Sequence, residues 1–201
     1  MFDNRVCWVN QEVGMFNFRK ILAVLLICPA IAGISQAQVF VIGTGFGTDC
    51  YNKTANAYAS FLDAEQTCTR ALREETMTAK NRAATYVNRG VLRMRAGKYE
   101  ESLTDYADAI ALNPDLAEAY LNKGSVYIYQ RDFASALAPI NKSLELGITD
   151  AHAAYYNRGI ARENTGDING AYDDYARALE LKPDWDLAIM QLDRFEITPV
   201  D

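Results

Sequence analysis

A five-residue block that recurs three times constrains the fold of this chain more than any other feature. The block reads tyrosine, an apolar residue, asparagine, a basic residue and glycine, and it occupies residues 86–90, 120–124 and 155–159. Its glycines are 34 and 35 residues apart. A repeat of this length indicates stacked structural units, because one unit cannot bury its own apolar face and needs a neighbour to cover it.

Four further positions recur at fixed distances after each block, and they hold large and small residues alternately. A small residue lets two helices approach closely, and a large one fills the space beside it. The columns are Tyr99, Phe133 and Ile168; Ser102, Ala136 and Ala171; Tyr106, Ile140 and Tyr175; and Ala109, Ser143 and Ala178. Pro114 and Pro183 close the first and third units, because the residue before a proline disfavours helical geometry. The second unit ends at Gly147 instead.

These columns resemble those of the tetratricopeptide repeat (TPR), whose unit is a hairpin of two antiparallel helices. The resemblance implies an all-α fold, an α-solenoid of TPR helical hairpins with three full repeats at residues 83–116, 117–150 and 152–185. The turns within the hairpins are expected at residues 97–98, 131–132 and 166–167. Pro139 falls inside the second helix of the middle repeat and predicts a bend there.

Two columns depart from the usual family pattern. Charged residues stand where TPR units normally carry leucine, namely Arg89, Lys123 and Arg158. The large apolar column that follows reads Arg93, Tyr127 and Arg162. The first helix of each repeat is therefore expected to be unusually polar.

Both ends of a repeat array need a cover. On one side, apolar residues at helical spacing predict a C-terminal capping helix over residues 186–196, with Trp185, Ala188, Ile189, Leu192 and Phe195 on its apolar face. On the other side, Ala64, Cys68, Ala71 and Leu72 reproduce the second-helix pattern of a repeat. Residues 49–82 are therefore expected to form a degenerate helical hairpin.

Residues 1–37 have the features of a secretory signal peptide. Arg19 and Lys20 precede an apolar run over residues 21–34, and Ser35, Gln36 and Ala37 form a small-x-small site for cleavage after Ala37. A 14-residue helix measures about 21 Å, which is short for a hydrocarbon layer of about 30 Å. An uncleaved anchor and a buried N-terminal helix are the alternatives. Met15 begins a compact version of the same signal, so residues 1–14 can be read as an upstream extension.

Residues 38–48 are expected to form an extended N-terminus of the mature chain. Their glycines imitate a dinucleotide-binding loop, but Thr48 stands where that motif needs its third glycine, and helical hairpins follow. Cleavage after Ala37 leaves two cysteines, Cys50 and Cys68. An even pair in an exported protein favours a disulfide, and two unpaired buried thiols are the alternative.

Composition narrows the classes of function. A net charge of −6 and a pI of about 4.9 argue against a nucleic-acid partner. One histidine, His152, cannot supply a multi-histidine metal site. The acidic pairs Asp105 with Asp108 and Asp173 with Asp174 are interpreted as solvated helix faces. No catalytic or metal site and no cofactor is predicted, and we do not expect an enzyme.

The family resemblance implies a concave groove lined by the first helix of each repeat. Asn88, Asn122 and Asn157 share one position in these helices, where an asparagine in several TPR proteins hydrogen-bonds the main chain of a bound peptide. The alternatives are that they recur only because the unit was duplicated, or that they bond to a neighbouring helix. The other residues predicted to line the groove are Val91, Arg95, Leu121, Ser125, Tyr129, Tyr156 and Ile160.

The predicted function is that of an exported adaptor, periplasmic or secreted, which binds a peptide or partner helix of another protein in this groove. A structural subunit of a cell-envelope or enzyme-associated complex, docking through its TPR surface, is the alternative. No permanent membrane span is expected after signal cleavage. The terminal-carboxylate clamp of chaperone adaptors is not supported, because Val87, Val91 and Ala153 stand where that clamp places Lys, Asn and Lys. A hydrolase in the N-terminal hairpin would have only the two cysteines as nucleophiles.

Overall fold

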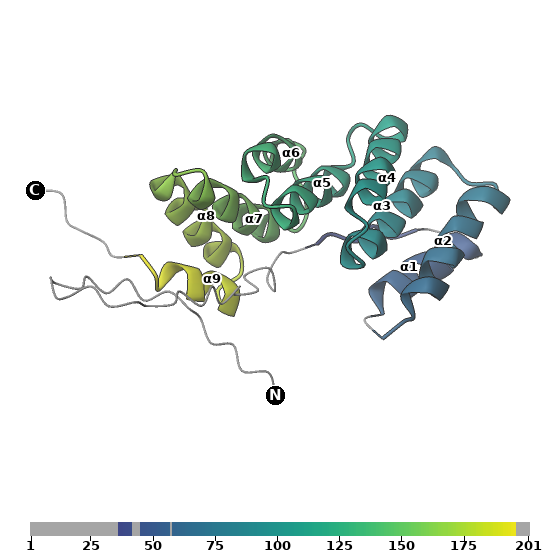
Figure 1. Ribbon diagram of the computed structural model, residues 1–201, viewed down its shortest axis with the longest axis horizontal. Coiled ribbons are helices and arrows are strands. Elements are labelled where there is room, and N and C mark those ends of the chain that lie inside the picture. Colours follow the sequence, from purple (N-terminus) through teal and green to yellow (C-terminus); the bar gives the residue numbers. More distant parts are fainter. Residues whose placement is uncertain (1–35, 42–44, 57, 196–201) are drawn as a thin grey trace, which may run out of the picture. The chain divides into compact units, whose positions relative to one another are not determined.

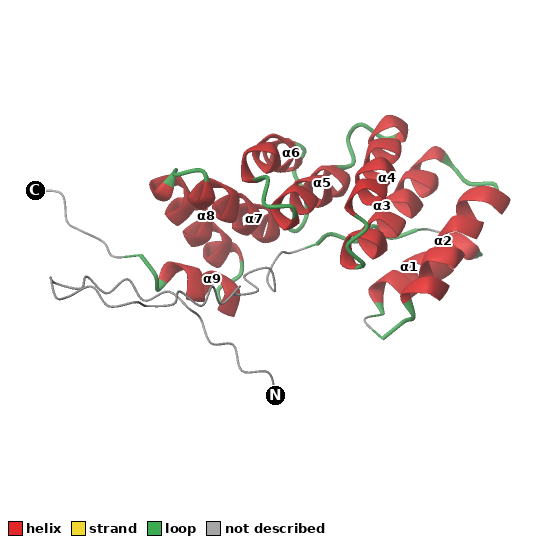
Figure 2. Ribbon diagram, in the orientation of Figure 1, coloured by secondary structure: helices red, strands yellow, loops and turns green. Residues whose placement is uncertain are grey.

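Helices make up most of the described part of the chain. The computed structural model describes residues 36–41, 45–56 and 58–195, and these contain nine helices and no strand (Figures 1 and 2). The helices are α1 (Phe46–Ala55), α2 (Phe61–Glu74), α3 (Ala79–Arg95), α4 (Tyr99–Leu112), α5 (Ala117–Tyr129), α6 (Phe133–Glu145), α7 (Ala151–Asn164), α8 (Ile168–Leu181) and α9 (Asp186–Leu192).

Consecutive helices pair into hairpins, and the hairpins stack in chain order. The closest pairs are α3 with α4, α5 with α6 and α7 with α8, and α1 with α2 forms a further hairpin before them. Each second helix then packs on the first helix of the next hairpin (Figure 1). First helices also contact one another, α3 with α5 and α5 with α7. The predicted all-helical solenoid of TPR hairpins is confirmed.

The three glycines of the repeated block hold equivalent places. A Cβ atom added at Gly90 would lie 2.5 Å from Cε1 of Tyr106, and one at Gly159 would lie 2.6 Å from Cε1 of Tyr175. At Gly124 the corresponding neighbour is Ile140, whose Cγ1 would be 2.4 Å away. No side chain fits at such distances, so glycine at this column lets the two helices of a hairpin touch.

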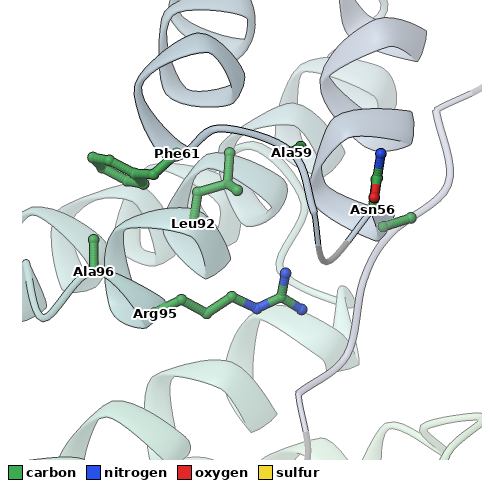
Figure 3. A pocket seen from close by; sticks show the side chains of 7 residues that line it. Asn56, Ala59, Phe61, Leu92, Arg95 and Ala96 are labelled. Carbon is green, nitrogen blue, oxygen red and sulfur yellow. The ribbon is translucent and has the colours of Figure 1, made fainter.

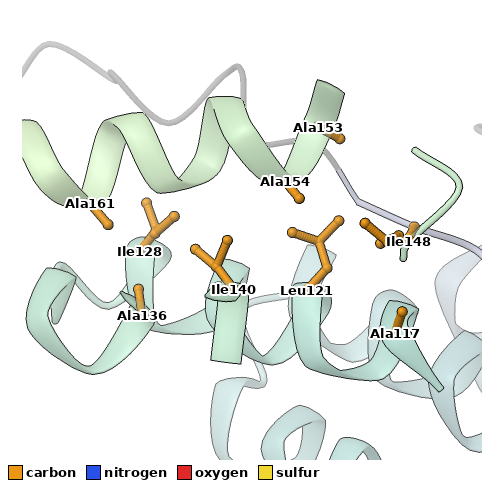
Figure 4. Close-up of a cluster of buried hydrophobic side chains, with 10 residues drawn as sticks. Ala117, Leu121, Ile128, Ala136, Ile140, Ile148, Ala153, Ala154 and Ala161 are labelled. Carbon is orange, nitrogen blue, oxygen red and sulfur yellow. The ribbon is translucent and has the colours of Figure 1, made fainter. Parts of the chain in front are cut away.

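Apolar side chains fill the spaces between the hairpins. One cluster includes Leu121 and Ile128 of α5, Ile140 of α6, and Ala154 and Ala161 of α7 (Figure 4). A second cluster centres on Tyr106 between α3, α4 and α5. A third joins Tyr156, Tyr175 and Ala188 at the C-terminal end. The core is thus a row of local contacts between neighbouring hairpins, as stacked repeats require.

The charged columns of the first helices surround buried carboxylates. In the first repeat, the guanidinium of Arg89 donates to both oxygens of Asp105 at 2.7–3.2 Å, and Arg93 reaches the same carboxylate at 3.0 Å. In the third repeat, Arg158 donates to Asp174 at 2.7 and 2.8 Å, and Arg162 at 2.9 Å. In these two repeats, the arginines of the first helix are therefore paired with an aspartate of the second helix of the same hairpin.

The interpretation of the acidic pairs as solvated faces is half wrong. Asp108 and Asp173 are exposed, but Asp105 and Asp174 are buried, with side chains 1% and 3% exposed. The reason is that each buried aspartate faces the arginines of the preceding helix, which satisfy its charge. In the middle repeat the same columns hold Lys123, Tyr127 and Pro139, so the arginines and the aspartate are absent together.

Several element boundaries differ from the expected ones, including the end of the capping helix, because α9 ends at Leu192. Residues 38–48 were expected to be extended, but α1 begins at Phe46, where Glu75 accepts a hydrogen bond from the Gly47 backbone N–H at 2.9 Å. The limit between residues 82 and 83 falls inside α3, which begins at Ala79 because the Thr78 hydroxyl accepts from the Asn81 backbone N–H. Pro139 lies within α6, and the predicted bend stays a prediction.

The chain's two ends are described only in part. Of the predicted signal peptide, Gln36 and Ala37 are described and residues 1–35 lie outside the described residues, as does residue 196 of the expected capping helix. In the described ranges, no helix has the length and hydrophobicity needed to cross a bilayer. Cys50 of α1 and Cys68 of α2 are joined by a disulfide with a Cα–Cα distance of 4.7 Å.

Candidate peptide-binding groove

Residues 36–41 lie across the first helices of the repeats as an extended segment, which we call the N-terminal strap. The strap passes α5 and then α3 on the way to α1, so it runs opposite to the order of the repeats (Figure 1). Its residues alternate between polar or exposed and apolar side chains, as an extended chain with one buried face requires. The predicted peptide groove is therefore occupied by the protein's own chain.

Asn122 of α5 holds Ala37 by both of its main-chain groups. The Ala37 N–H donates to the Asn122 side-chain oxygen at 2.9 Å, and the Asn122 side-chain nitrogen donates to the Ala37 carbonyl at 2.5 Å. Asn122 is fully buried and Ala37 is 2% exposed. A buried amide without partners costs about 1–3 kcal/mol, and the two main-chain groups of Ala37 avoid that cost when they cover Asn122.

Asn88 of α3 repeats the same arrangement two residues further along the strap. The Val39 N–H donates to the Asn88 side-chain oxygen at 3.1 Å, and the Asn88 side-chain nitrogen donates to the Val39 carbonyl at 2.8 Å. Asn88 is also fully buried. Residues two apart in an extended chain face the same side, so one step between repeats corresponds to two residues of the strap.

A third contact recognises the side chain of Gln36. Its amide nitrogen donates to the Tyr129 hydroxyl at 3.2 Å, and its amide oxygen accepts from the Arg95 guanidinium at 2.9 Å. Burial raises the pKa of Tyr129, so the phenol stays neutral at physiological pH. A donor and an acceptor of the Gln36 amide are both matched by side chains of the repeats.

The apolar residues of the strap pack into the repeats. Ala37 belongs to the cluster that contains Leu121 and Ala154, and Val39 packs on the cluster around Tyr106. Val41 is 3% exposed and lies against α1, with its Cγ1 only 3.2 Å from where a Gly47 Cβ would be. The groove therefore accepts a small residue at the Asn122 position and β-branched residues at the next two inward positions.

A cavity of about 310 Å³ lies beside the strap, between the N-terminal hairpin and α3 (Figure 3). It is lined by Ala55, Asn56, Ala59, Phe61, Leu92, Arg95 and Ala96. Arg95 stands at its edge and extends its guanidinium toward the strap, where it also donates to the Thr54 carbonyl at 2.8 Å. The Arg95 guanidinium thus contacts the strap and α1, and Arg95 also lines the cavity.

The other predicted groove residues divide into three groups. Asn157 donates to the Ser125 hydroxyl at 3.0 Å, which is a bond to the neighbouring helix, as one alternative reading of this column expected. Val91 and Leu121 are fully buried, Leu121 in the cluster that contains Ala37, and Ile160 is partly buried between two clusters. Tyr156 is 2% exposed, with the rings of Trp185 and Tyr175 packed against it, and its place in the groove stays a prediction.

Sequence reasoning missed the strap as an occupant of the groove, and with it the contribution of Thr54 in α1. Thr54 accepts through its main-chain oxygen from both Gln38 and Arg95. The available signal was an apolar residue at every second position, Ala37, Val39 and Val41, which predicts an extended chain with one apolar face, although Phe40 puts an apolar residue on the other face as well. It did not identify the surface that this face would cover.

Two observations on the described residues bear on metal-binding and nucleophilic groups near this groove. In the described part of the chain, no three His, Cys, Asp or Glu side chains come together as a metal site would require. The two thiols that a hydrolase in the N-terminal hairpin would use are bonded to each other and fully buried. The groove binds the main chain of Ala37 and Val39 and the polar side chains of Gln36 and Gln38.

Comparisons with known proteins agree with this geometry. Family models match residues 83–130 (TPR repeat), 117–146 (Tetratricopeptide repeat) and 152–185 (Tetratricopeptide repeat). Human Tetratricopeptide repeat protein 6 is 40% identical over 58 residues, which cover 29% of this chain and 11% of that protein. The chain spans between 11% and 16% of the length of the first curated relatives it matches.

Two solved structures show the same arrangement of helices. The first TPR domain of Spaghetti (RPAP3), bound to the HSP90 peptide SRMEEVD, has a TM-score of 0.54 at 27% identity and covers 60% of this chain and 94% of that one. MamA from Desulfovibrio magneticus RS-1 has a TM-score of 0.60 at 18% identity over 74% of this chain and 82% of that one, which is a likeness of fold. Residues 83–146 and 152–185 match models of the tetratricopeptide repeat, and over this part of its length the chain is similar to that family.

Proposed function

We propose that this protein is an exported, non-enzymatic adaptor that holds an extended segment of another protein in the groove formed by α3, α5 and α7. One observation carries the proposal: Asn88 and Asn122 each bond both main-chain groups of a strap residue. Every residue offers the same N–H and C=O, so these two side chains can hold a segment of almost any sequence.

The energetics favour an extended ligand. Four hydrogen bonds at about 1 kcal/mol each, plus burial of alternate side chains, give a specific but reversible grip. Both asparagines are fully buried with the strap in place, so a main chain in the groove satisfies their amides where water would otherwise bond to them. The related TPR domain of Spaghetti (RPAP3) was solved with a bound peptide, which supports peptide binding as the use of such a groove.

The ligand is expected to be an internal segment rather than a chain terminus. At the positions where a carboxylate clamp places Lys, Asn and Lys, Val87 and Val91 are fully buried and Ala153 is 2% exposed. No charge at these three positions could fix a terminal carboxylate. Arg95 is occupied by the Gln36 side chain and the Thr54 carbonyl.

Export to the periplasm or the exterior rests on two features. The N-terminal sequence has the charge, apolar run and small-residue site of a secretory signal. The disulfide between Cys50 and Cys68 is of a kind that forms and persists in oxidising compartments. Both point to the same location, although they come from different parts of the chain.

One observation favours the alternative of a structural subunit that docks through another TPR surface. The strap already fills the groove, so a partner could use an outer face without displacing anything. A subunit would copurify in fixed proportion with its complex. An adaptor would instead bind peptides reversibly and with modest affinity.

The test is a binding panel of extended peptides with the wild-type chain and the Asn88→Ala/Asn122→Ala variant. Peptides bound by the wild type should bind the variant about tenfold or more weakly, because the main-chain bonds are lost. Asn164→Ala is the matched control, since that exposed amide bonds only the Ile160 carbonyl of its own helix. Equal binding by wild type and double variant would exclude the groove as the site.

Export is tested separately. The chain is expressed with its own N-terminus in a Gram-negative host, and the N-terminal residue and cell fraction of the product are determined. A periplasmic product that begins at Gln38 is the expected result. A product that keeps its first residues and stays in the cytoplasm would contradict export.

A further inference from the structure

The bond at which the signal peptide should be cut lies inside the groove. Ala37 is 2% exposed, both of its main-chain groups are bonded to Asn122, and Gln38, the residue on the other side of the bond, donates to the Thr54 carbonyl at 3.2 Å. A protease needs an extended, accessible main chain with free N–H and C=O groups. In the folded chain this main chain is bonded to the repeats.

We infer that the folded repeats and the signal peptidase compete for the main chain at Ala37. We also infer that cleavage opens the half of the groove that holds Gln36 and Ala37 to a segment of another protein. The inference rests on the proposed export and on the proposed groove. In the uncut chain the N-terminal strap fills the groove and makes its own cleavage site inaccessible to the protease. We call this arrangement the latch. Cleavage before the repeats close removes Gln36 and Ala37 and leaves Val39 and Val41 in place.

The two halves of the groove are separable in the structure. Asn122, Tyr129 and Arg95 bind only Gln36 and Ala37 of the strap. Asn88 binds Val39, and Val41 lies against α1. The new N-terminus at Gln38 therefore keeps its anchor on Asn88, while Asn122 loses both partners of its buried amide.

The vacated half defines the chemistry of its ligand. It takes an extended main chain at Asn122, a side chain no larger than alanine beside Leu121, and before that residue a glutamine between Tyr129 and Arg95. The ligand class is thus an extended segment of a partner protein with a glutamine followed by a small residue. Its chain would run toward the N-terminus of the cut protein.

Competition is tested with the full-length chain, synthesised without membranes in mild detergent. Signal peptidase is added either during synthesis or after folding, and the new N-terminus at Gln38 is quantified by mass spectrometry. We expect cutting during synthesis and a rate roughly tenfold or more lower after folding, because proteolysis follows the small population in which the strap is released.

Variants of the strap and of the groove show whether docking causes the protection. Val39→Asp should restore cutting of the folded chain, because a charge cannot enter the apolar cluster at that position. Asn88→Ala/Asn122→Ala should do the same. Phe40→Asp is the matched control, since Phe40 is 61% exposed and should leave the protection intact. Circular dichroism verifies that each variant is folded.

The opened half is tested with the acetylated tripeptide amide Ser-Gln-Ala, followed by NMR of the Asn122 side-chain amide. The signal should shift in the cut chain and not in the uncut chain. Ser-Gln-Leu should bind at least about tenfold more weakly, because the site beside Leu121 is closed around an alanine. Equal shifts in cut and uncut chains would overturn the inference.

The outcomes separate this inference from the function on which it rests. Equal cutting of nascent and folded chains, or restored cutting by Phe40→Asp, would show that docking of the strap does not protect the cleavage site. Either result would contradict this inference but not the proposed export or the proposed groove. No cutting in either condition shows that residues 1–37 are not a cleaved signal, which removes the export proposal and the latch together. Peptide binding in the panel is unaffected by either result.

Discussion

Arg131 occupies a backbone conformation that its two counterparts reach with glycine. Gly97, Arg131 and Gly166 stand in the same turn of successive hairpins, with φ of 74°, 62° and 90°. Left-handed backbone costs a non-glycine residue about 1–2 kcal/mol. The middle hairpin thus tolerates strain that the other two avoid.

We predict that Arg131→Gly stabilises the protein by about 0.5–1 kcal/mol, because relief of the strained backbone exceeds the added entropy of the unfolded chain. The measurement is the midpoint of urea unfolding. Gly97→Ala is the reciprocal change and should destabilise by a similar amount, since a Cβ there meets nothing within 4 Å and only the backbone is strained. An unchanged midpoint for both variants would contradict the argument.

His152 is the chain's single histidine and lies edge-on against Trp185, with ring centroids 4.9 Å apart. Burial, together with nearby Lys182, lowers its pKa below 6.5, against an opposing effect of Asp150. The folded chain therefore binds a proton at this residue more weakly than the unfolded chain does. Stability from this residue is complete above pH 6.5 and is lost as the pH falls toward the folded pKa.

The predicted consequence is a decrease in unfolding free energy between pH 7.5 and 5.5 that is smaller in His152→Gln. Urea unfolding at both pH values, followed by tryptophan fluorescence, measures it. The comparison is internal, because each protein serves as its own reference at pH 7.5. The same decrease in both proteins would show that His152 is not its source.

At the scale of elements, the hairpins use two different solutions to the same packing problem. The first and third join their helices through a buried aspartate held by two arginines, and the middle one has Lys123, Tyr127 and Pro139 in those columns. The hydrogen bond to Asp174 raises the pKa of Arg158. The charges are satisfied locally, so polar first helices are compatible with a closed solenoid.

Removal of the buried Asp174 carboxylate should destabilise the protein much more than removal of the exposed carboxylate of its neighbour Asp173. Asp174→Ala leaves Arg158 and Arg162 without their shared partner and should destabilise by about 2 kcal/mol, discounted for the partial exposure of the arginines. Asp173→Ala removes an exposed charge on the same helix and should change stability by less than about 0.5 kcal/mol. Thermal unfolding of the two variants decides; equal effects would contradict the pairing.

At the scale of the whole molecule, stability is divided among neighbouring hairpins, because each contacts only those next to it. The N-terminal hairpin differs from the rest in having a covalent link between its helices. It also forms the wall of the groove against which Val41 packs. The disulfide therefore stabilises one end of the array and one end of the groove.

We predict that Cys50→Ala/Cys68→Ala lowers stability locally. The closed loop of 18 residues corresponds to about 3 kcal/mol in the chain-entropy model. Hydrogen exchange should show lost protection in α1 and α2 while α7 and α8 keep theirs. Uniform loss along the chain would mean that the array unfolds as one unit.

Much of this architecture could be predicted because its signals are local and repeated. Glycine at 90, 124 and 159 and the large residue that faces it recur in each unit, so three copies identified one packing contact. The burial of Asp105 and Asp174 was harder, since an isolated acidic residue on a helix is usually solvated. The arginines of the preceding helix explain the burial of both aspartates, because they pair with the carboxylates.

By itself, the sequence determined the repeats, their limits to within a few residues and the column of asparagines, because helix packing selects residue size at fixed spacing. Only the tertiary structure decided what those asparagines hold. Asn122 and Asn88 hold the main-chain groups of Ala37 and Val39, which lie 85 and 49 residues away in the chain, while Asn157 donates to the Ser125 hydroxyl. Main-chain groups are the same in every residue, so a contact made through them leaves no mark in the sequence of the segment that is bound.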